Sequence, residues 1–106
     1  MKLYLSSMDS ESFAYRRDCF VEKRVIFNES NKNALICKIN PSVFIDGIEI
    51  SNVILTARHE GFDILDFSKY PCFVHICIYK NKEKISNNYL NSDDISILAW
   101  GELYKH

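Results

Sequence analysis

The chain has 106 residues, 47% of them hydrophobic, and 13 basic against 14 acidic residues give a formal net charge of -1. This length accommodates one hydrophobic core, so residues 1–106 are predicted to form a single domain. The composition excludes an intrinsically disordered chain, and the balanced charge provides no overall field that would attract nucleic acid or anionic lipid. Nucleic acid is therefore not an expected partner.

The start of the chain predicts a short strand over residues 2–5, ended by the polar run of residues 6–12. Asp9 and Glu11 interrupt this segment before any apolar stretch of signal-peptide length appears. No apolar run elsewhere approaches the roughly 20 residues that a membrane span needs. We therefore expect a cytoplasmic protein without a transmembrane segment.

Residues 13–28 alternate between apolar and polar side chains, which predicts a strand with one inward face. A straight strand of this length would extend roughly 50 Å, far beyond the radius of gyration of about 13 Å expected for such a domain. We therefore predict a bend or break at residues 16–18. A helix over residues 9–20, packed on a sheet, is the alternative, because Phe13, Arg17 and Phe20 can share a helical face.

The middle of the chain contains a strong hairpin signal at Asp46-Gly47. Both central residues of a type I′ turn take positive φ, which Asp and Gly tolerate, so strands are predicted at residues 43–45 and 48–50. A preceding strand is expected to end at Asn40-Pro41. The other extended segments predicted in this region cover residues 34–39, 53–59 and 62–67.

The clearest strand follows Pro71 and covers residues 72–80. Its even positions form an apolar row that we expect to be core, namely Cys72, Val74, Ile76 and Ile78. Residues 85–94 predict a long loop with one helical turn. The last strand, residues 95–104, is expected to place Ile95, Ile97, Ala99, Gly101 and Leu103 on one face and Ser96, Leu98, Trp100, Glu102 and Tyr104 on the other.

Together these elements predict a mainly β fold, a small antiparallel barrel or two-sheet sandwich of seven or eight short strands. The alternative is an α+β fold in which one N-terminal helix packs on a sheet. Either architecture leaves rims and strand ends for recognition.

The four cysteines, Cys19, Cys37, Cys72 and Cys77, adjoin apolar runs and are expected to be free thiols that behave as small buried hydrophobic residues. Without an export signal, disulfides are not expected. The spacings Cys-x-x-Cys and His-x-x-x-His are absent from the sequence, so no metal and no cofactor are predicted.

His75 and Cys77 are the candidates for a reactive thiol. Two residues apart on a strand, they share a face with Cα atoms about 6.5–7 Å apart, and an imidazolium beside a thiol favours the thiolate. A metal could be held by the same pair with His59 and a nearby Asp63 or Asp66. The simpler interpretation is that both side chains fill a second, partly buried face of the strand.

Arg58, His59 and Glu60 stand together before Gly61 at the end of a predicted strand, where a rigid scaffold commonly displays binding residues. An ordinary solvated turn with an Arg58–Glu60 ion pair is the alternative. Trp100 and Tyr104 share one face of the last strand, and Trp and Tyr are frequent anchors at protein interfaces. These five residues are the candidate binding residues, with another protein or a second copy of the chain as the expected partner.

The leading functional hypothesis is a small cytoplasmic protein-interaction module, of the adaptor or inhibitor/antidote type. P-loop, dinucleotide-binding, nucleophile-elbow and zinc-protease signatures are all absent from the sequence, which favours a non-enzyme. One alternative is a barrel that binds a small ligand or single-stranded nucleic acid, using a stripe of Arg16, Arg17, Lys23, Arg24, Lys80, Lys82 and Lys84 interleaved with aromatic residues. The other alternative is a thiol- or metal-dependent enzyme.

Overall fold

The computed structural model describes residues 2–7, 9–80 and 88–105. Its strands are β1 (Leu3–Ser7), β2 (Arg17–Phe27), β3 (Asn33–Ile45), β4 (Ile48–Ala57), β5 (Cys72–Tyr79), β6 (Tyr89–Leu90) and β7 (Ile95–Lys105). The helical elements are single 3-10 turns, η1 (Glu11–Phe13), η2 (Phe67–Lys69) and η4 (Ser92–Asp94). Within the described ranges no helix is long and apolar enough to cross a bilayer.

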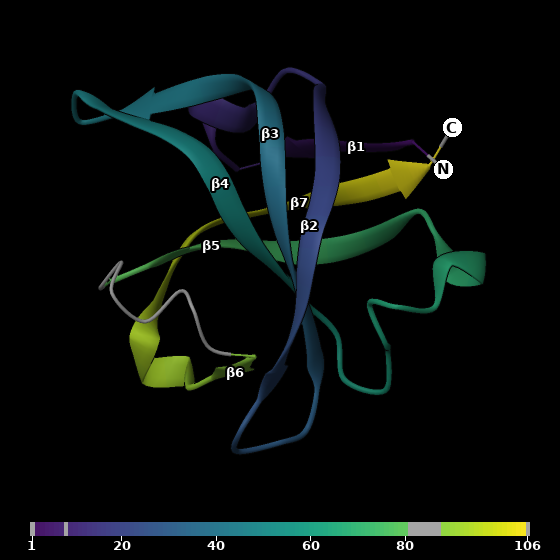
Figure 1. Ribbon diagram of the computed structural model, residues 1–106. Coiled ribbons are helices and arrows are strands. Elements are labelled where there is room, and N and C mark those ends of the chain that lie inside the picture. The colour runs from purple at the N-terminus through teal and green to yellow at the C-terminus, as the bar shows by residue number, and fades with distance from the viewer. Residues whose placement is uncertain (1, 8, 81–87, 106) are drawn as a thin grey trace.

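Six of the strands close into an antiparallel barrel in the order β1-β7-β5-β4-β3-β2, because β2 pairs back onto β1 (Figure 1). The seventh strand, β6, pairs in parallel with the far end of β2. This confirms the predicted mainly β barrel. The helical alternative for residues 9–20 is wrong, since η1 is the only helical turn there and Arg17 already begins β2.

The core fills the barrel with side chains from alternate strand positions. The even row of β5 is confirmed as core, since Val74 and Ile76 are fully buried while Cys72 and Ile78 pack at its edge. Phe13 from η1 is also completely buried and closes one end of the interior. A single apolar residue in a polar loop therefore supplies one of the largest side chains of the core.

The bend predicted at residues 16–18 is partly misplaced. The chain does change direction before Arg17, whose guanidinium donates to the carbonyl oxygens of Ser12 (2.8 Å) and Pro41 (2.7 Å). Inside β2, however, the irregularity is a bulge between Val21 and Lys23. Bulges of this kind bend a strand around a barrel without ending it, because one extra residue lengthens only one side of the ladder.

A similar irregularity carries β3 through the point where the sequence predicted an end. The register between β3 and β4 shifts between Lys38 and Val43, and Asn40-Pro41 lies inside the strand. The hairpin beyond it is confirmed, with Asp46 at φ 51° and Gly47 at φ 79°. The predicted separate strands of residues 34–39 and 43–45 are thus one long, bent strand.

A bulge in β7 overturns the predicted alternation of its first half. Ile76 of β5 pairs with Ala99 of β7, but the next residue of β5, Cys77, pairs with Ile97. Leu98 is therefore the extra residue of β7 at this point. As a result Ile97 is 62% exposed, whereas Leu98 packs against the core. The prediction that residues 95, 97, 99, 101 and 103 share one face holds only from Ala99 onward.

The predicted strand at residues 62–67 is wrong, because this segment forms turns that end in η2. The carboxylates of Asp63 and Asp66 accept the backbone N–H groups of Leu65 and Ser68, which stabilises local turns over an extended ladder. Of the predicted loop at residues 85–94, the described part contains β6 and the single turn η4, and residues 85–87 lie outside the described residues.

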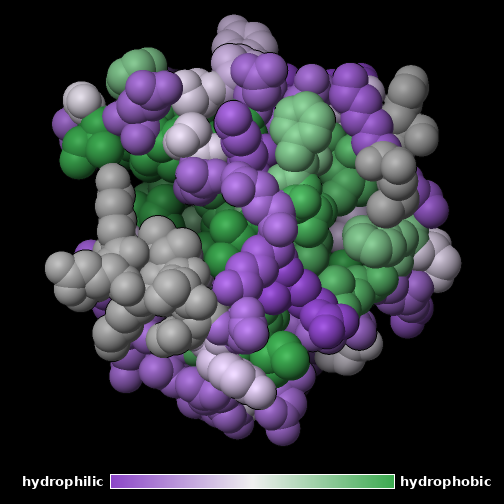
Figure 2. Space-filling model, viewed as in Figure 1, coloured by the Kyte–Doolittle hydropathy of each residue, from purple (hydrophilic) through white to green (hydrophobic). Residues whose placement is uncertain are grey.

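A second, smaller hydrophobic cluster lies on the outer side of the barrel wall. Its buried members are Val25, Ala34, Ile36, Ile54, Cys77 and Leu90. Leu90 from β6 covers the outward side chains of the neighbouring strands, so parts of β3 and β4 are buried on both faces. Figure 2 shows hydrophobic residues on both sides of a hydrophilic band across the molecule.

Candidate functional site

The outer face of β1, β7 and β5 gathers aromatic and charged side chains from distant parts of the sequence. After its bulge β7 directs every second residue outward, and the antiparallel register sets the neighbours of these residues. The cross-strand pairs are Tyr104 with Tyr4, Glu102 with Phe73, and Trp100 with His75.

Arg58 lies over Trp100 at one end of this face. The guanidinium carbon is 3.9 Å from the centre of the indole ring, a cation–π contact. Phe73 meets Trp100 edge-on at 5.7 Å between ring centres, and His59 meets Phe73 in the same manner at 6.0 Å. Three segments, the turn after β4, strand β5 and strand β7, thus form one continuous contact.

A second arginine lies over aromatic rings at the other end of the face. The Arg16 guanidinium carbon is 3.6 Å from the ring centre of Tyr4 and 5.7 Å from that of Tyr104. The two tyrosine rings stack with centres 5.6 Å apart, and the Lys2 ammonium lies 5.4 Å from Tyr4. We call this surface the aromatic–arginine face, made of Arg16, Arg58, Tyr4, Tyr104, Phe73 and Trp100.

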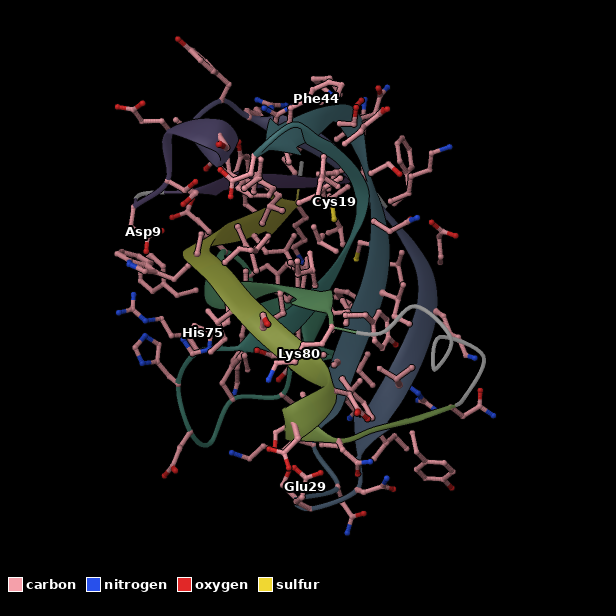
Figure 3. The ribbon with its side chains drawn as sticks, turned by 90° about the vertical axis from the view of Figure 1, so that its left-hand side faces the viewer. Asp9, Cys19, Glu29, Phe44, His75 and Lys80 are labelled. Atoms are coloured by element: carbon pink, nitrogen blue, oxygen red, sulfur yellow. The ribbon has the colours of Figure 1, made fainter. Side chains whose placement is uncertain are left out.

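Hydrogen bonds from the end of β1 fix the backbone beneath Trp100. The Asp9 carboxylate accepts the Trp100 N–H at 3.0 Å, and the Ser7 hydroxyl donates to the Trp100 carbonyl oxygen at 2.8 Å. The same hydroxyl accepts the backbone N–H of Ser10 at 3.1 Å. Figure 3 shows Asp9 on the same side of the molecule as His75. Both the N–H and the carbonyl group of Trp100 are therefore hydrogen-bonded to side chains that follow or end β1, which fixes the backbone that carries the indole.

His75 titrates in an environment that disfavours its charged form. Its pKa is lowered first by burial and then by the positive charges of Arg58 and His59, while Asp9 acts in the opposite direction. The imidazole is therefore mainly neutral at pH 7. The positive charges at this face therefore come from Arg16, Arg58 and the Lys2 ammonium beside Tyr4.

The structure links three of the five predicted binding residues, Arg58, His59 and Trp100, through Phe73, and it places Tyr104 with Tyr4 and Arg16 at the other end of the same face. Glu60 lies exposed in the adjoining turn, and the described residues contain no ion pair between it and Arg58. Sequence reasoning missed Tyr4 and Phe73 as members of this face and placed Arg16 in a different, basic stripe. The pairing of β1 with β7 places Tyr4 on this face, and the pairing of β5 with β7 places Phe73 there, and neither pairing can be read from local sequence. Lys82 and Lys84 of that stripe lie outside the described residues.

Whereas His75 is only partly buried, Cys77 is fully buried. Burial raises its pKa to about 11, although a hydrogen bond with Thr56 acts in the opposite direction, so the thiol is protonated at neutral pH. The four cysteines are free thiols, as predicted, and Cys72 is the only one that is not fully buried. Among the residues that the structure describes, no three His, Cys, Asp or Glu side chains gather as a metal site.

Comparison of the chain with protein-family models gives no match, and comparison with curated proteins and with solved structures gives none either.

Proposed function

We propose that the chain is a small protein-interaction domain, of the adaptor or inhibitor/antidote type, that binds its partner through the aromatic–arginine face. The observation that supports this proposal is the stacking of Arg58 on Trp100 and of Arg16 on Tyr4 on one outer surface of the barrel. Arg, Trp and Tyr supply much of the binding energy of protein interfaces, because each combines a large contact area with directed polar groups.

The two guanidinium groups favour a partner that carries carboxylates. Stacking orients each group while its N–H edges stay available, and within the described chain neither Arg16 nor Arg58 forms an ion pair with a carboxylate. Paired N–H donors of this kind match the two oxygens of Asp or Glu. Because the rings already fix the arginines, binding costs less side-chain entropy. We infer a partner surface with carboxylates around an apolar side chain.

A comparison of two double variants tests the proposal. Immobilised wild-type protein is used to capture a partner, and the same capture is repeated with Arg58→Ala/Trp100→Ala and with Lys38→Ala/Phe44→Ala. The second variant is the control, since it likewise removes one cation and one aromatic ring, both exposed on β3. We expect the first variant to lose the partner and the control to retain it, with unchanged circular dichroism in both. Equal capture by both variants would contradict the assignment of the face.

Two further measurements separate this proposal from its alternatives. Size-exclusion chromatography with mass measurement shows whether the partner is a second copy, in which case Arg58→Ala/Trp100→Ala should convert a dimer into a monomer. A mixed-sequence single-stranded oligonucleotide should not bind. Binding that weakens with salt and disappears in this variant would assign the face to nucleic acid instead.

A further inference from the structure

A cavity of about 600 Å³ shares no lining residue with the aromatic–arginine face. It is enclosed by the turn between β2 and β3, the segment after β4, and the start of β7. Figure 3 places Glu29, one of its lining residues, at the end of the barrel away from Phe44. Cavities of roughly 300–1,000 Å³ are typical of small-molecule sites.

Apolar side chains from four segments form the inner surface of this cavity. They are Phe27, Ala57, Phe62, Ile95 and Ile97, and Cys77 and Thr56 also line the cavity. Ile97 is 62% exposed because the β7 bulge turns it outward, so a large aliphatic group faces solvent along the cavity wall. An apolar molecule seated here would remove this surface from water, which is favourable in proportion to the area covered.

Two carboxylates at the rim determine which charge such a molecule should carry. Glu29 accepts the backbone N–H of Ser92 at 3.1 Å through Oε2, and the hydrogen bonds with Ser92 lower its pKa. Asp63 accepts the Leu65 N–H at 3.0 Å and the Asn33 side-chain amide at 3.3 Å, both through Oδ1. Lys32 also lines the cavity, and the two carboxylates outweigh its charge. The rim is therefore net negative and held in place by hydrogen bonds.

We propose that this cavity binds a small organic cation, with an apolar ring or branched body against Ile95, Ile97 and Phe62 and a protonated amine near Glu29 and Asp63. The apolar wall provides the contact area, and the fixed carboxylates provide charge complementarity. This site is separate from the proposed protein-interaction face, so either can be disproved without the other.

A matched pair of probes tests the proposal. Tryptamine and indole-3-acetate share the same ring system but carry opposite charges at pH 7.5. Each is titrated into the ¹⁵N-labelled protein and followed by nuclear magnetic resonance. We expect tryptamine to bind about five- to tenfold more tightly than indole-3-acetate, with shifts in the amides of Ala57, Phe62, Ile95 and Ile97. The Trp100 indole N–H should not shift.

Variants then identify the source of the preference. Glu29→Gln/Asp63→Asn keeps the side-chain size and one acceptor oxygen per residue but removes both charges, and it should bring the two affinities to within about twofold. Glu11→Gln/Asp46→Asn removes the same net charge at exposed positions outside the cavity lining and should leave the preference unchanged. Absence of binding by both probes, equal binding to the wild type, or an unchanged preference in the first variant would overturn the proposal.

Discussion

Gly101 faces the backbone of Ser6 so closely across the β1–β7 ladder that a side-chain carbon at position 101 would overlap the Ser6 carbonyl oxygen. The obstacle is backbone, which cannot rotate away as a flexible side chain could. Glycine is therefore required here by the approach of two strands, and its φ angle is not the reason. The same close approach brings the Ser7 hydroxyl within reach of the Trp100 carbonyl oxygen.

Gly101→Ala should destabilise the protein by about 1–3 kcal/mol, because overpacking forces the backbone of β1 away from β7. Urea unfolding measures the loss, and hydrogen exchange should show reduced protection of the Leu3 and Leu5 amides. Gly61→Ala serves as the comparison, since that site has positive φ but open space. It should cost about 1–2 kcal/mol from backbone strain and leave β1 protected. Normal stability and protection in Gly101→Ala would contradict the close approach.

Tyr70→Phe should lower the free energy of unfolding by about 1–2 kcal/mol. The buried Tyr70 hydroxyl donates to the Ile64 carbonyl oxygen at 2.6 Å, and its removal leaves that carbonyl without this donor. Tyr15→Phe is the matched control, since Tyr15 is 80% exposed, and it should change stability by less than about 0.5 kcal/mol. Equal effects of the two substitutions would show that the Tyr70 bond contributes nothing.

Acidification should weaken the protein partly through His75. The native pKa of His75 is lowered, chiefly by burial, so the unfolded chain takes up this proton at a higher pH than the native protein does. Stability therefore falls as the pH drops through the ordinary histidine value, and the loss ends below the native pKa. The free energy of unfolding is measured with urea at pH 7.5 and at pH 5.0. Its decrease between these two pH values should be smaller in His75→Gln than in the wild type. An equal loss in both proteins would rule out this contribution.

Alkylation with iodoacetamide should be slow at every cysteine of the native protein, with Cys72 reacting first. Cys72 is the half-buried thiol, and burial raises its pKa to about 11. At pH 7.5 this lowers the thiolate population about a hundredfold relative to an ordinary cysteine. Peptide mass mapping over time gives the order of reaction. Rapid modification of Cys77 would instead support the hypothesis of a reactive thiol at that position.

Side-chain alternation predicted the barrel because most of its strands have one face toward the core. The turn chemistry of Asp46-Gly47 predicted its hairpin for an equally local reason, the tolerance of both residues for positive φ. Alternation failed where a bulge inserts one residue. Alternation predicted Ile97 on the inward face and Leu98 on the outward face, and the structure reverses them. Which of the two is buried depends on the register of β7 with β5, and no local sequence pattern specifies that register.

The aromatic–arginine face could be predicted only in part for the same reason. Trp100 and Tyr104 lie on one strand, so their common face follows from spacing alone, and the charged turn that contains Arg58 is visible as a break in polarity. Tyr4 joins them through the pairing of the first and last strands, which are nearly the whole chain apart. Such long-range register is set by the closure of the barrel as a whole.

The burial of β3 and β4 from both sides has a consequence for how this protein can vary in evolution. Four successive residues, Ala34 to Cys37, are buried, as are the three from Val53 to Leu55. Neighbouring positions in these blocks face alternately the barrel core and the second hydrophobic cluster outside the barrel wall. Neither block therefore contains a position at which substitutions can accumulate freely. Relatives that have diverged elsewhere should still be recognisable by two uninterrupted apolar segments separated by a variable hairpin.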